Sequence, residues 1–400
     1  MSALEQSMTQ VRTTGGAARP LIAHIVFRFD YGGLENGIVN IVNSLPAGEF
    51  DHAIIALTES SEFSSRIRRP DVRVFSLHKQ PGTDIGAYVR LWKLLRRIKP
   101  AVVHTRNIGT MDCLFVAWLA GAPVRIHGEH GWDVHDPDGT NRKYLAMRRV
   151  LNLITHAFVT VSRDLEQWLL GRVGIPSRKV MQICNGVDTE RFRPVSTAAR
   201  RASLPADRFP ANCIVIGSVS RLTAIKDPLN LVRAFLAIRK PLATAGRDVR
   251  LALIGDGPLR ASIETEIRAA GEEQAVWLSG SRDDVAELMQ ALDIFVLGSQ
   301  REGISNTVLE AMATGLPVIA SATGGNLELV ESGVTGKLVP PGDSAALANA
   351  IRSYVEDDST RLAHGAAARA RAEQVYSLGG MVNRYRELYA MQCKRVMETT

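Results

Sequence analysis

Short runs of consecutive apolar residues alternate along the chain with helix-length segments in which apolar and polar positions are mixed. Strands that are apolar on both faces are typical of a parallel sheet covered by helices. In the first half the predicted strands are Leu21–Phe27, His52–Leu57, Val72–Leu77, Ala101–His104, Val124–His127, Ala157–Val161 and Val180–Cys184. In the second half they are Cys213–Val219, Val249–Ile254, Ala275–Leu278, Ile294–Leu297, Pro317–Ala320 and Gly336–Val339. The repeated strand–helix order predicts an α/β fold.

The chain length predicts two domains. Four hundred residues exceed what one core usually holds. The strand–helix order pauses at 192–210, which contains three prolines and several polar residues and is typical of a linker. We place the boundary near residue 205, between a first domain over 21–205 and a second over 206–375. We expect 376–400 to form a helix that crosses back to the first domain, and the polar, small-residue segment 1–20 to be a disordered tail.

Composition and charge exclude some classes of protein. The chain is 46% hydrophobic and 22% charged, which is ordinary for a soluble globular enzyme. A net charge of +7 suits nucleic acid, an anionic membrane or an anionic substrate, but the basic residues are dispersed, so we expect no nucleic acid partner. The four cysteines are isolated in sequence, which argues against zinc or disulfides and suits a reducing cytosol. The longest apolar stretch, Met111–Val124, is too short to span a bilayer.

In open parallel sheets ligands bind beyond the carboxyl ends of the strands, so the loops that follow strands are where chemistry is expected. Gly32 and Gly33 follow the first predicted strand and allow a ligand to approach the backbone closely. The helix that begins there offers free N–H groups to a phosphate. A tight turn that binds nothing is the alternative. The pattern Gly-x-Gly-x-x-Gly is absent, which disfavours a Rossmann oxidoreductase.

A second candidate is His130, which precedes Gly131 after another predicted strand. A histidine in this place can hydrogen-bond a hydroxyl or take part in proton transfer. The alternative is an exposed loop histidine, and we expect the neighbouring His127 and His135 to be structural. The run Asp136–Asp138 resembles an Asp-x-Asp metal motif, but its central proline and polar surroundings favour a turn. We therefore predict no metal site.

A third candidate is the pair Arg221 and Lys226, which flank a short loop after the first strand of the second domain. The loop leads into a helix that begins near Asp227–Pro228, where proline is well tolerated. Two cations in this place suit a diphosphate, because arginine can bind two of its oxygens at once. Two solvated surface charges are the alternative.

The fourth candidate is the segment 302–314, which we expect to form a helix with Glu302 and Glu310 eight positions apart. Eight residues correspond to about 12 Å along a helix, so one carboxylate can meet a sugar and the other a ribose. The residues that favour a helix start are Gly303, Ser305 and Asn306. The spacing of the two glutamates alone favours two solvated charges on a helix. The position of the segment directly after a strand favours a ligand-binding site.

Together these motifs resemble the large retaining glycosyltransferase family 4, which has the GT-B fold of two doubly wound Rossmann-like domains facing across a cleft. The matching residues are Gly32-Gly33, His130-Gly131, Asn185-Gly186-Val187-Asp188, Arg221 with Lys226, Glu302-Gly303-Ile304-Ser305-Asn306 followed by Glu310, Gly324-Gly325-Asn326, and Gly333–Val339. The match runs from about residue 21 to residue 390. Each motif is weak alone, and the combination is specific.

The resemblance implies a role for each matching residue. Arg221 and Lys226 would hold the donor diphosphate, with Gly32 and Gly33 approaching the phosphate from the first domain. Glu302 would contact the hydroxyls of the donor sugar, and Glu310 the ribose. The segment Gly303, Ile304, Ser305 and Asn306 would supply backbone amides. His130 would contact the sugar near the reacting carbon, so His130 and Glu302 are the expected catalytic residues.

The implied activity is transfer of a sugar, with retention and without a metal or cofactor, from a UDP- or GDP-sugar to a glycan or lipid-linked acceptor. The run from His24 to Gly37 resembles sugar transferases of bacterial exopolysaccharide and PEP-CTERM/exosortase systems. One alternative is a nucleotide-sugar epimerase of the same fold, which would act on the donor alone. Another is a non-catalytic donor-binding subunit, against which the presence of all four charged residues argues.

The segment Ile85–Ile98 has basic and apolar residues at helical spacing. It could rest as an amphipathic helix on an anionic membrane that carries a lipid-linked acceptor. We favour the alternative, a helix that packs on the core and solvates its cationic face. The expected location is the cytoplasm, with contact at the inner face of the cytoplasmic membrane as a hypothesis.

Overall fold

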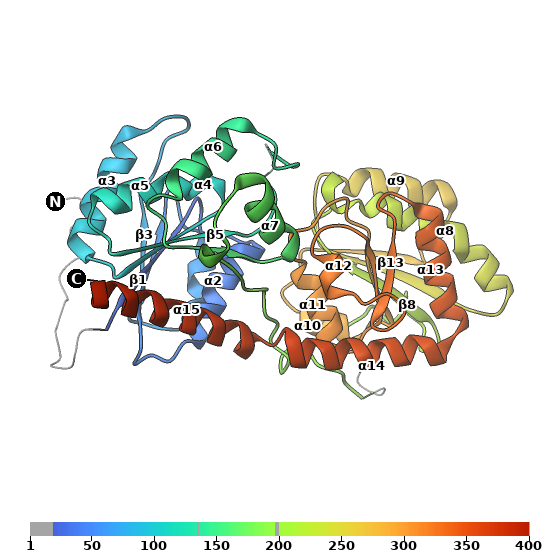
Figure 1. Ribbon diagram of the computed structural model, residues 1–400. Coiled ribbons are helices and arrows are strands. Elements are labelled where there is room, and N and C mark those ends of the chain that lie inside the picture. The colour runs from blue at the N-terminus through green and yellow to red at the C-terminus, as the bar shows by residue number, and fades with distance from the viewer. Residues whose placement is uncertain (1–18, 134–135, 197–199, 400) are drawn as a thin grey trace.

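The computed structural model describes residues 19–133, 136–196 and 200–399. Within them the chain forms two α/β domains that lie side by side, each a parallel sheet with helices on both faces (Figure 1). The predicted fold class is confirmed, and each of the thirteen predicted strands is present, three with the predicted bounds and the others with ends shifted by a few residues. The expectations for residues 1–18 and for His135 fall outside the described residues.

The first domain contains a seven-stranded parallel sheet in the order β3-β2-β1-β4-β5-β6-β7. The strands are β1 (Leu21–Val26), β2 (Asp51–Ala56), β3 (Arg73–Ser76), β4 (Val102–Arg106), β5 (Val124–Glu129), β6 (Ala157–Thr160) and β7 (Val180–Gln182). The helices are α2 (Gly33–Ser44), α3 (Ile85–Ile98), α4 (Ile108–Met111), α5 (Cys113–Leu119), α6 (Arg142–Leu151) and α7 (Arg163–Trp168). The strand order changes direction between β1 and β4, the place where open sheets bind ligands.

The second domain contains a six-stranded parallel sheet in the order β10-β9-β8-β11-β12-β13. The strands are β8 (Ile214–Val219), β9 (Val249–Ile254), β10 (Val276–Gly280), β11 (Ile294–Leu297), β12 (Val318–Ser321) and β13 (Gly336–Val339). The helices are α8 (Pro228–Thr244), α9 (Arg260–Ala270), α10 (Val285–Gln290), α11 (Asn306–Ala313), α12 (Asn326–Leu329), α13 (Ser344–Glu356) and α14 (Asp358–Val375). Its direction changes between β8 and β11, so both sheets have their switch point at matching places.

The last helix, α15 (Leu378–Thr399), belongs to the first domain by its packing. It runs on from α14 under the first sheet (Figure 1), where Tyr385 and Tyr389 are buried in the core together with Ile22 of β1. The chain therefore passes between the domains twice. The two passages are hydrogen-bonded to each other, because Val187 N donates to Tyr376 O and Leu378 N donates to Val187 O, both at 2.8 Å.

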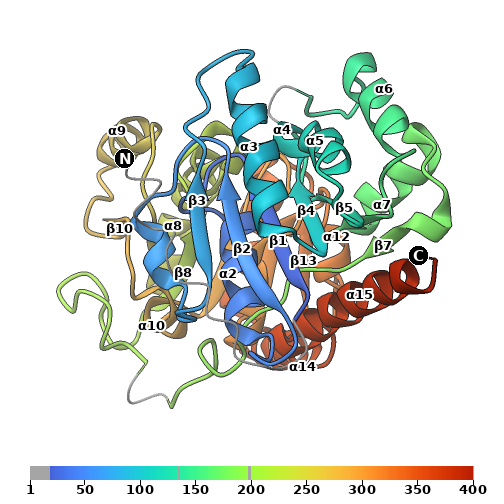
Figure 2. The ribbon, with the colours of Figure 1, turned by 90° about the vertical axis from the view of Figure 1, so that its left-hand side faces the viewer.

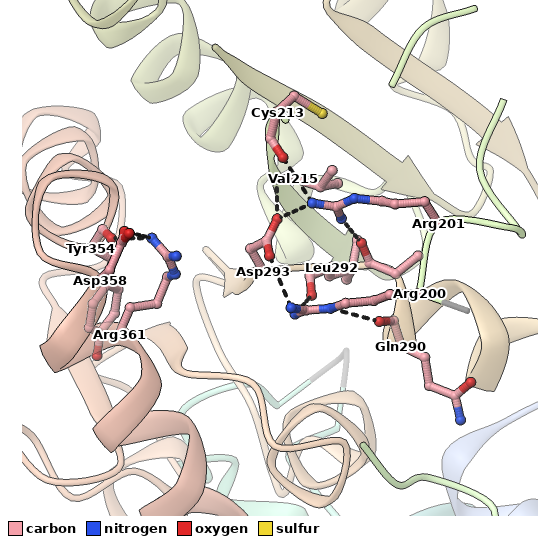
Figure 3. A network of polar contacts seen from close by, with 11 residues as sticks. Arg200, Arg201, Cys213, Val215, Gln290, Leu292, Asp293, Tyr354, Asp358 and Arg361 are labelled. Carbon is pink, nitrogen blue, oxygen red and sulfur yellow. Dashed lines mark hydrogen bonds and ion pairs between the residues drawn. The ribbon is translucent and has the colours of Figure 1, made fainter. Parts of the chain in front are cut away.

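The segment after the first passage is tied to the second domain by two arginines (Figure 3). Arg201 Nη2 donates to Asp293 Oδ2 at 2.6 Å, and Arg200 lies 3.3 Å from the other oxygen of this carboxylate. The same Asp293 accepts from Val215 N at 2.7 Å, at the start of β8. The arginines also donate to the backbone carbonyls of Gln290, Ala291, Leu292 and Cys213. These bonds fix Arg200 and Arg201 to the second domain.

No helix among the described residues is long and apolar enough to cross a membrane.

Candidate active site

The loops that follow the strands of one sheet meet the loops that follow the strands of the other. From the first domain come Gly33 after β1, His130–Gly131 after β5 and Asn185 after β7. From the second domain comes the segment 303–306, which lies between β11 and α11. The carboxyl ends of both parallel sheets therefore face the domain junction, which is where α/β folds of this kind place their chemistry.

Asn306 connects the two domains at this junction. Its Oδ1 accepts a hydrogen bond of 2.8 Å from Asn185 Nδ2. A Cβ atom placed on Gly33 would lie 3.0 Å from Asn306 Nδ2, so the first-domain backbone approaches this amide closely because Gly33 has no side chain. The structure thus brings Gly33 and Asn306 together. The neighbouring Gly32 is the residue before α2, and a Cβ there would meet the carboxylate of Glu35.

Gly303 lies against the backbone of the His130–Gly131 loop. A Cβ on Gly303 would be 2.9 Å from Gly131 Cα and 3.0 Å from His130 O, which are backbone atoms that cannot swing aside. Gly131 itself has φ +149°, a conformation that L side chains rarely adopt. The two loops therefore touch only because both positions are glycine. Gly325 N supports the contact from behind by donating to Gly303 O at 2.9 Å.

Glu302 is held by two neighbours in the second domain. Its Oε1 accepts from Lys226 Nζ at 2.5 Å and from Ser299 Oγ at 2.6 Å. The carboxylate is 8% exposed and Ser299 is fully buried. Among the described residues both bonds go to the same oxygen, so Oε2 is the atom left to accept from a ligand hydroxyl. Lys226 and Glu302, which the sequence assigns to different parts of a donor, are thus in direct contact.

Arg221 lies at the end of β8 with an exposed side chain. Its guanidinium forms no hydrogen bond or ion pair with another described residue, whereas its backbone O accepts from Thr223 N at 2.9 Å. Its loop is fixed from below, because Leu222 N donates to Asp256 O at 2.9 Å. The structure therefore leaves this guanidinium available to an anion, while Lys226 of the same loop is occupied by Glu302.

The predicted helix across 302–314 is wrong at its start. α11 begins at Asn306, and Ser305 caps it by accepting a hydrogen bond from Val308 N at 3.3 Å. Ser305 favours a cap because its side chain replaces a missing backbone acceptor. Glu302 and Ile304 therefore precede the helix, and the estimate of about 12 Å between the two glutamates along one helix does not apply.

Glu310 lines a small cavity of about 90 Å³ between the domains. The other lining residues come from α2, the passage after β7, α11 and α15 and include Asn36, Asn40, Asn185, Arg191 and Asn306. Burial raises the pKa of Glu310 to about 7, although the charge of Arg191 opposes the shift. The carboxyl group thus sits among hydrogen-bonding side chains, as a group that binds hydroxyls requires.

His130 turns its ring into the first domain. Its backbone N donates to Asn107 Oδ1 at 2.7 Å, and its Nε2 lies beside Gly128 without a hydrogen-bond partner among the described residues. Burial, and secondarily the nearby charge of Arg106, lower the pKa of His130 to about 3. The imidazole is therefore neutral at pH 7. The part of His130 that meets the second domain is its carbonyl group.

The remaining sequence candidates have structural partners. His127 is buried between Thr105 and Glu129, as expected for a structural residue. Asp136 Oδ1 accepts from the backbone of residues 140 and 141, and Asp138 pairs with Arg301 across the domain junction at 2.6 Å. The predicted turn is present, and both carboxylates are engaged by the protein. Within the described residues no group of three His, Cys, Asp or Glu side chains is arranged to hold a metal ion.

Sequence reasoning missed two groups near the site. One is Ser299, whose only signal was its place at the end of β11, three residues before Glu302. The other is a buried cluster behind the Gly32–Gly33 loop, in which Arg106 is 2% exposed and its guanidinium makes no hydrogen bond within normal geometry to a described residue. Three buried histidines complete this cluster: His24, His52 and His104. No local motif marks them, because they come together only through the order of β2, β1 and β4.

Comparison with known proteins gives matches over most of the chain. The family model of glycosyl transferases group 1 matches residues 200–371, and that of glycosyltransferase family 4 matches residues 31–191. A putative glycosyltransferase of Bacillus subtilis, EpsF, is 31% identical over 306 residues, which are 75% of this chain and 78% of EpsF.

Two further matches concern a named transferase and a solved structure. The Escherichia coli UDP-Gal:alpha-D-GlcNAc-diphosphoundecaprenol alpha-1,3-galactosyltransferase is 28% identical over 283 residues, covering 68% of this chain and 71% of that protein. The crystal structure of Anabaena HepE in complex with UDP and glucose superposes with a TM-score of 0.78 at 22% identity, covering 93% of this chain and 100% of HepE.

Proposed function

Because the chain belongs to the glycosyltransferases of group 1 and family 4 and has the GT-B fold, we propose that it is a retaining transferase that uses a UDP- or GDP-sugar. Its acceptor is a glycan or a lipid-linked glycan, and its role is in bacterial exopolysaccharide or cell-surface glycan synthesis. The name of the Escherichia coli relative supports this role, since that transferase acts on a diphosphoundecaprenol-linked sugar.

The observation that carries the proposal is the contact of Gly303 with the His130–Gly131 backbone, directly beside the Lys226–Glu302 pair. A carboxylate, an ammonium group and a helix N-terminus converge there on the junction of two domains. Glu302 Oε2 can accept from a sugar hydroxyl, and Lys226, Arg221 and the first N–H groups of α11 can bind a diphosphate.

Charge builds up on the nucleoside diphosphate as the bond to the sugar breaks. Fixed cations and helix-terminal N–H groups stabilise that charge without needing to reorganise, which supports a reaction that requires no metal. We infer retention by attack on the same face that the diphosphate leaves. The C1–O bond to the phosphate breaks, the acceptor oxygen bonds to C1, and the departing phosphate takes the acceptor's proton. Contact between the domains excludes water, which would hydrolyse the donor.

A lipid-linked acceptor would be used at a membrane surface. We infer that the protein works in the cytoplasm, at the inner face of the cytoplasmic membrane where lipid-linked acceptors are presented. The support for this location is the name of the Escherichia coli relative, because a sugar on diphosphoundecaprenol is held in a membrane.

Thermal-shift measurements with UDP-, GDP- and ADP-sugars, with and without magnesium, test the donor. We expect one UDP- or GDP-sugar to raise the melting temperature equally in both conditions. NMR of the product then tests retention through the anomeric configuration of the new bond. Turnover that requires magnesium, an inverted product, or isomerisation of the donor in the absence of an acceptor would each contradict the proposal.

Variants of the paired residues test the site. Glu302→Ala and Lys226→Ala should abolish transfer, since each removes one partner of the 2.5 Å contact at the domain junction. Circular dichroism should show an intact fold in both. Near wild-type transfer in both variants would contradict the site assignment.

A further inference from the structure

The first domain carries an exposed apolar surface on helices α3, α5 and α6 and the turn that follows α6, which we call the α3–α5–α6 face. It contains half of the sixteen large apolar side chains that are exposed in the described part of the chain. These eight residues are Ile85, Val89, Trp92, Phe115, Trp118, Leu119, Val150 and Leu153. Exposed apolar residues normally occur singly, and a cluster of this size marks a contact surface.

Six of these eight residues, all except Trp118 and Leu153, line a groove of about 810 Å³ between the three helices. Asp112 is the one carboxylate among its lining residues, and the hydroxyl of Tyr88 is hydrogen-bonded to it. Trp92 Nε1 donates to Leu119 O, so this indole also has its polar group satisfied within the protein. The groove therefore offers no polar partner to a ligand and suits hydrocarbon.

Helix α3 is apolar on two sides. Leu91 and Leu95 are buried against the sheet, as expected for a core-packing helix. Ile85 is 72% exposed, and Val89 and Trp92 are exposed on the same helix. The buried residues explain why the helix packs on the sheet. They do not explain why the exposed residues are apolar. A solvated cationic face alone would not need them.

Cations predominate on this face, and its carboxylate Asp112 is hydrogen-bonded to Tyr88. Helices α3 and α6 each carry four Lys or Arg residues and no Asp or Glu. The exposed members include Lys93, Arg96, Arg142 and Lys143. A protein partner with charges of both signs would complement these cations only in part. An anionic lipid surface complements both the cations and the hydrocarbon groove.

We propose that the α3–α5–α6 face docks on an anionic lipid bilayer, with the groove receiving acyl chains and the cations contacting lipid phosphates. This inference rests on the proposed function, because it names the surface that brings the site to a membrane-held acceptor. The face lies on the side of the first domain opposite α15 (Figures 1 and 2), so docking leaves the last helix and its contacts undisturbed.

Vesicle flotation of the protein tests the contribution of the apolar residues of this face to membrane binding. We expect the wild type to float with vesicles that contain phosphatidylglycerol, and Ile85→Ser/Val150→Ser to bind at least about tenfold more weakly, since each lost buried CH₂ group costs affinity. The matched control is Leu362→Ser/Val375→Ser on α14, which replaces side chains of 65% and 45% exposure in the other domain and should float like the wild type.

A second pair of variants tests the contribution of the cations to membrane binding. Lys93→Glu/Lys143→Glu should weaken binding by at least about 25-fold, because each cation near an anionic membrane contributes about fivefold. Lys240→Glu/Arg247→Glu makes the same change of charge on the second domain and should have little effect. Wild type that does not float, apolar variants that float normally, equal binding to phosphatidylcholine vesicles, or a groove-dependent dimer without lipid binding would overturn the proposal.

Donor binding separates this proposal from the proposed function. The groove variants should keep the full thermal shift with a nucleotide-sugar, because none of the residues assigned to the donor site lines the groove. If no nucleotide-sugar shifts any of the proteins while the wild type still floats, the proposed function fails and the docking surface stands.

Discussion

Replacing Gly303 by alanine tests whether the contact between the domains is part of catalysis. Gly303 does not have a left-handed backbone conformation, so alanine causes no backbone strain there and the effect is steric. The new methyl carbon would lie 2.9 Å from Gly131 Cα, whereas carbon atoms in contact are about 3.5–4.0 Å apart. The two loops must therefore separate by roughly 0.5–1 Å.

A misplacement of about 1 Å at a reacting centre costs roughly 100-fold in rate, which corresponds to about 2.7 kcal/mol. We therefore expect kcat/KM of Gly303→Ala to fall by about 100-fold. The melting temperature should change little, because the contact lies between two loops and Gly303 is not part of a buried core cluster. The assay is steady-state transfer at varied donor concentration, with circular dichroism to check the fold.

The matched control is Gly379→Ala in α15, where a Cβ would meet no atom within 4 Å and where alanine favours the helix. It should transfer at the wild-type rate. If Gly303→Ala also keeps kcat/KM within about threefold of the wild type, the loops are not held together during the reaction and the reasoning fails.

Three further outcomes are expected. Ser299→Ala should lower kcat by about tenfold because Glu302 loses one of the two bonds that orient it, and Ser299→Thr should restore part of the rate; equal loss in both variants would point to packing instead. Burial lowers the pKa of His52 to about 3, so as the pH falls the unfolded state is protonated before the folded state. Stability is therefore lost below about pH 6.5, by about 2 kcal/mol between pH 7 and pH 5 from this residue alone. A melting temperature that does not change over that range would contradict this. Asp293→Ala should lower the unfolding free energy by about 3–5 kcal/mol, since it removes the carboxylate that both arginines contact and leaves Val215 N without its acceptor. A loss under about 1 kcal/mol in urea titration would show the network to be dispensable.

The strands could be predicted because each is a run of apolar residues bounded by polar or turn-forming ones. That local property survives folding unchanged, and β9 has the predicted bounds, Val249–Ile254. The start of α11 could not be predicted in the same way. Glycine, serine and asparagine each tolerate several positions near a helix end, so the pattern indicated a helix start without fixing it at Asn306.

The site was predictable where a residue's role depends on its own loop. Lys226 and Glu302 each follow a strand, and that position indicated a shared ligand. The direct contact of Lys226 with Glu302, and the hydrogen bond that Ser299 adds to it, depend on how β8 and β11 pair. No local sequence pattern predicts that pairing. The inward turn of the His130 ring was unpredictable for the same reason, since it is decided by the packing around Gly128.

The buried cluster behind the first-domain loop shows the limit most plainly. His24 and His104 are directly opposite each other on β1 and β4, and His24 Nε2 lies 3.1 Å from His52 Nδ1 on β2. These residues are 28 and 80 positions apart along the chain, and each alone resembles an ordinary strand residue. Only the order of strands in the sheet makes them neighbours.

The return of α15 to the first domain has a consequence for how the protein is made. Tyr385 and Tyr389 complete the core around Ile22, yet they are synthesised more than 360 residues after it. During translation the second domain can close its core before the first has all of its parts, which reverses the usual order of folding from the N-terminus. Until α15 is made, the first domain therefore has only part of this face of its sheet covered, by residues such as Ile41 of α2 and Leu45 at the end of that helix. A chain that stops at residue 377 should lose the first domain and keep the second.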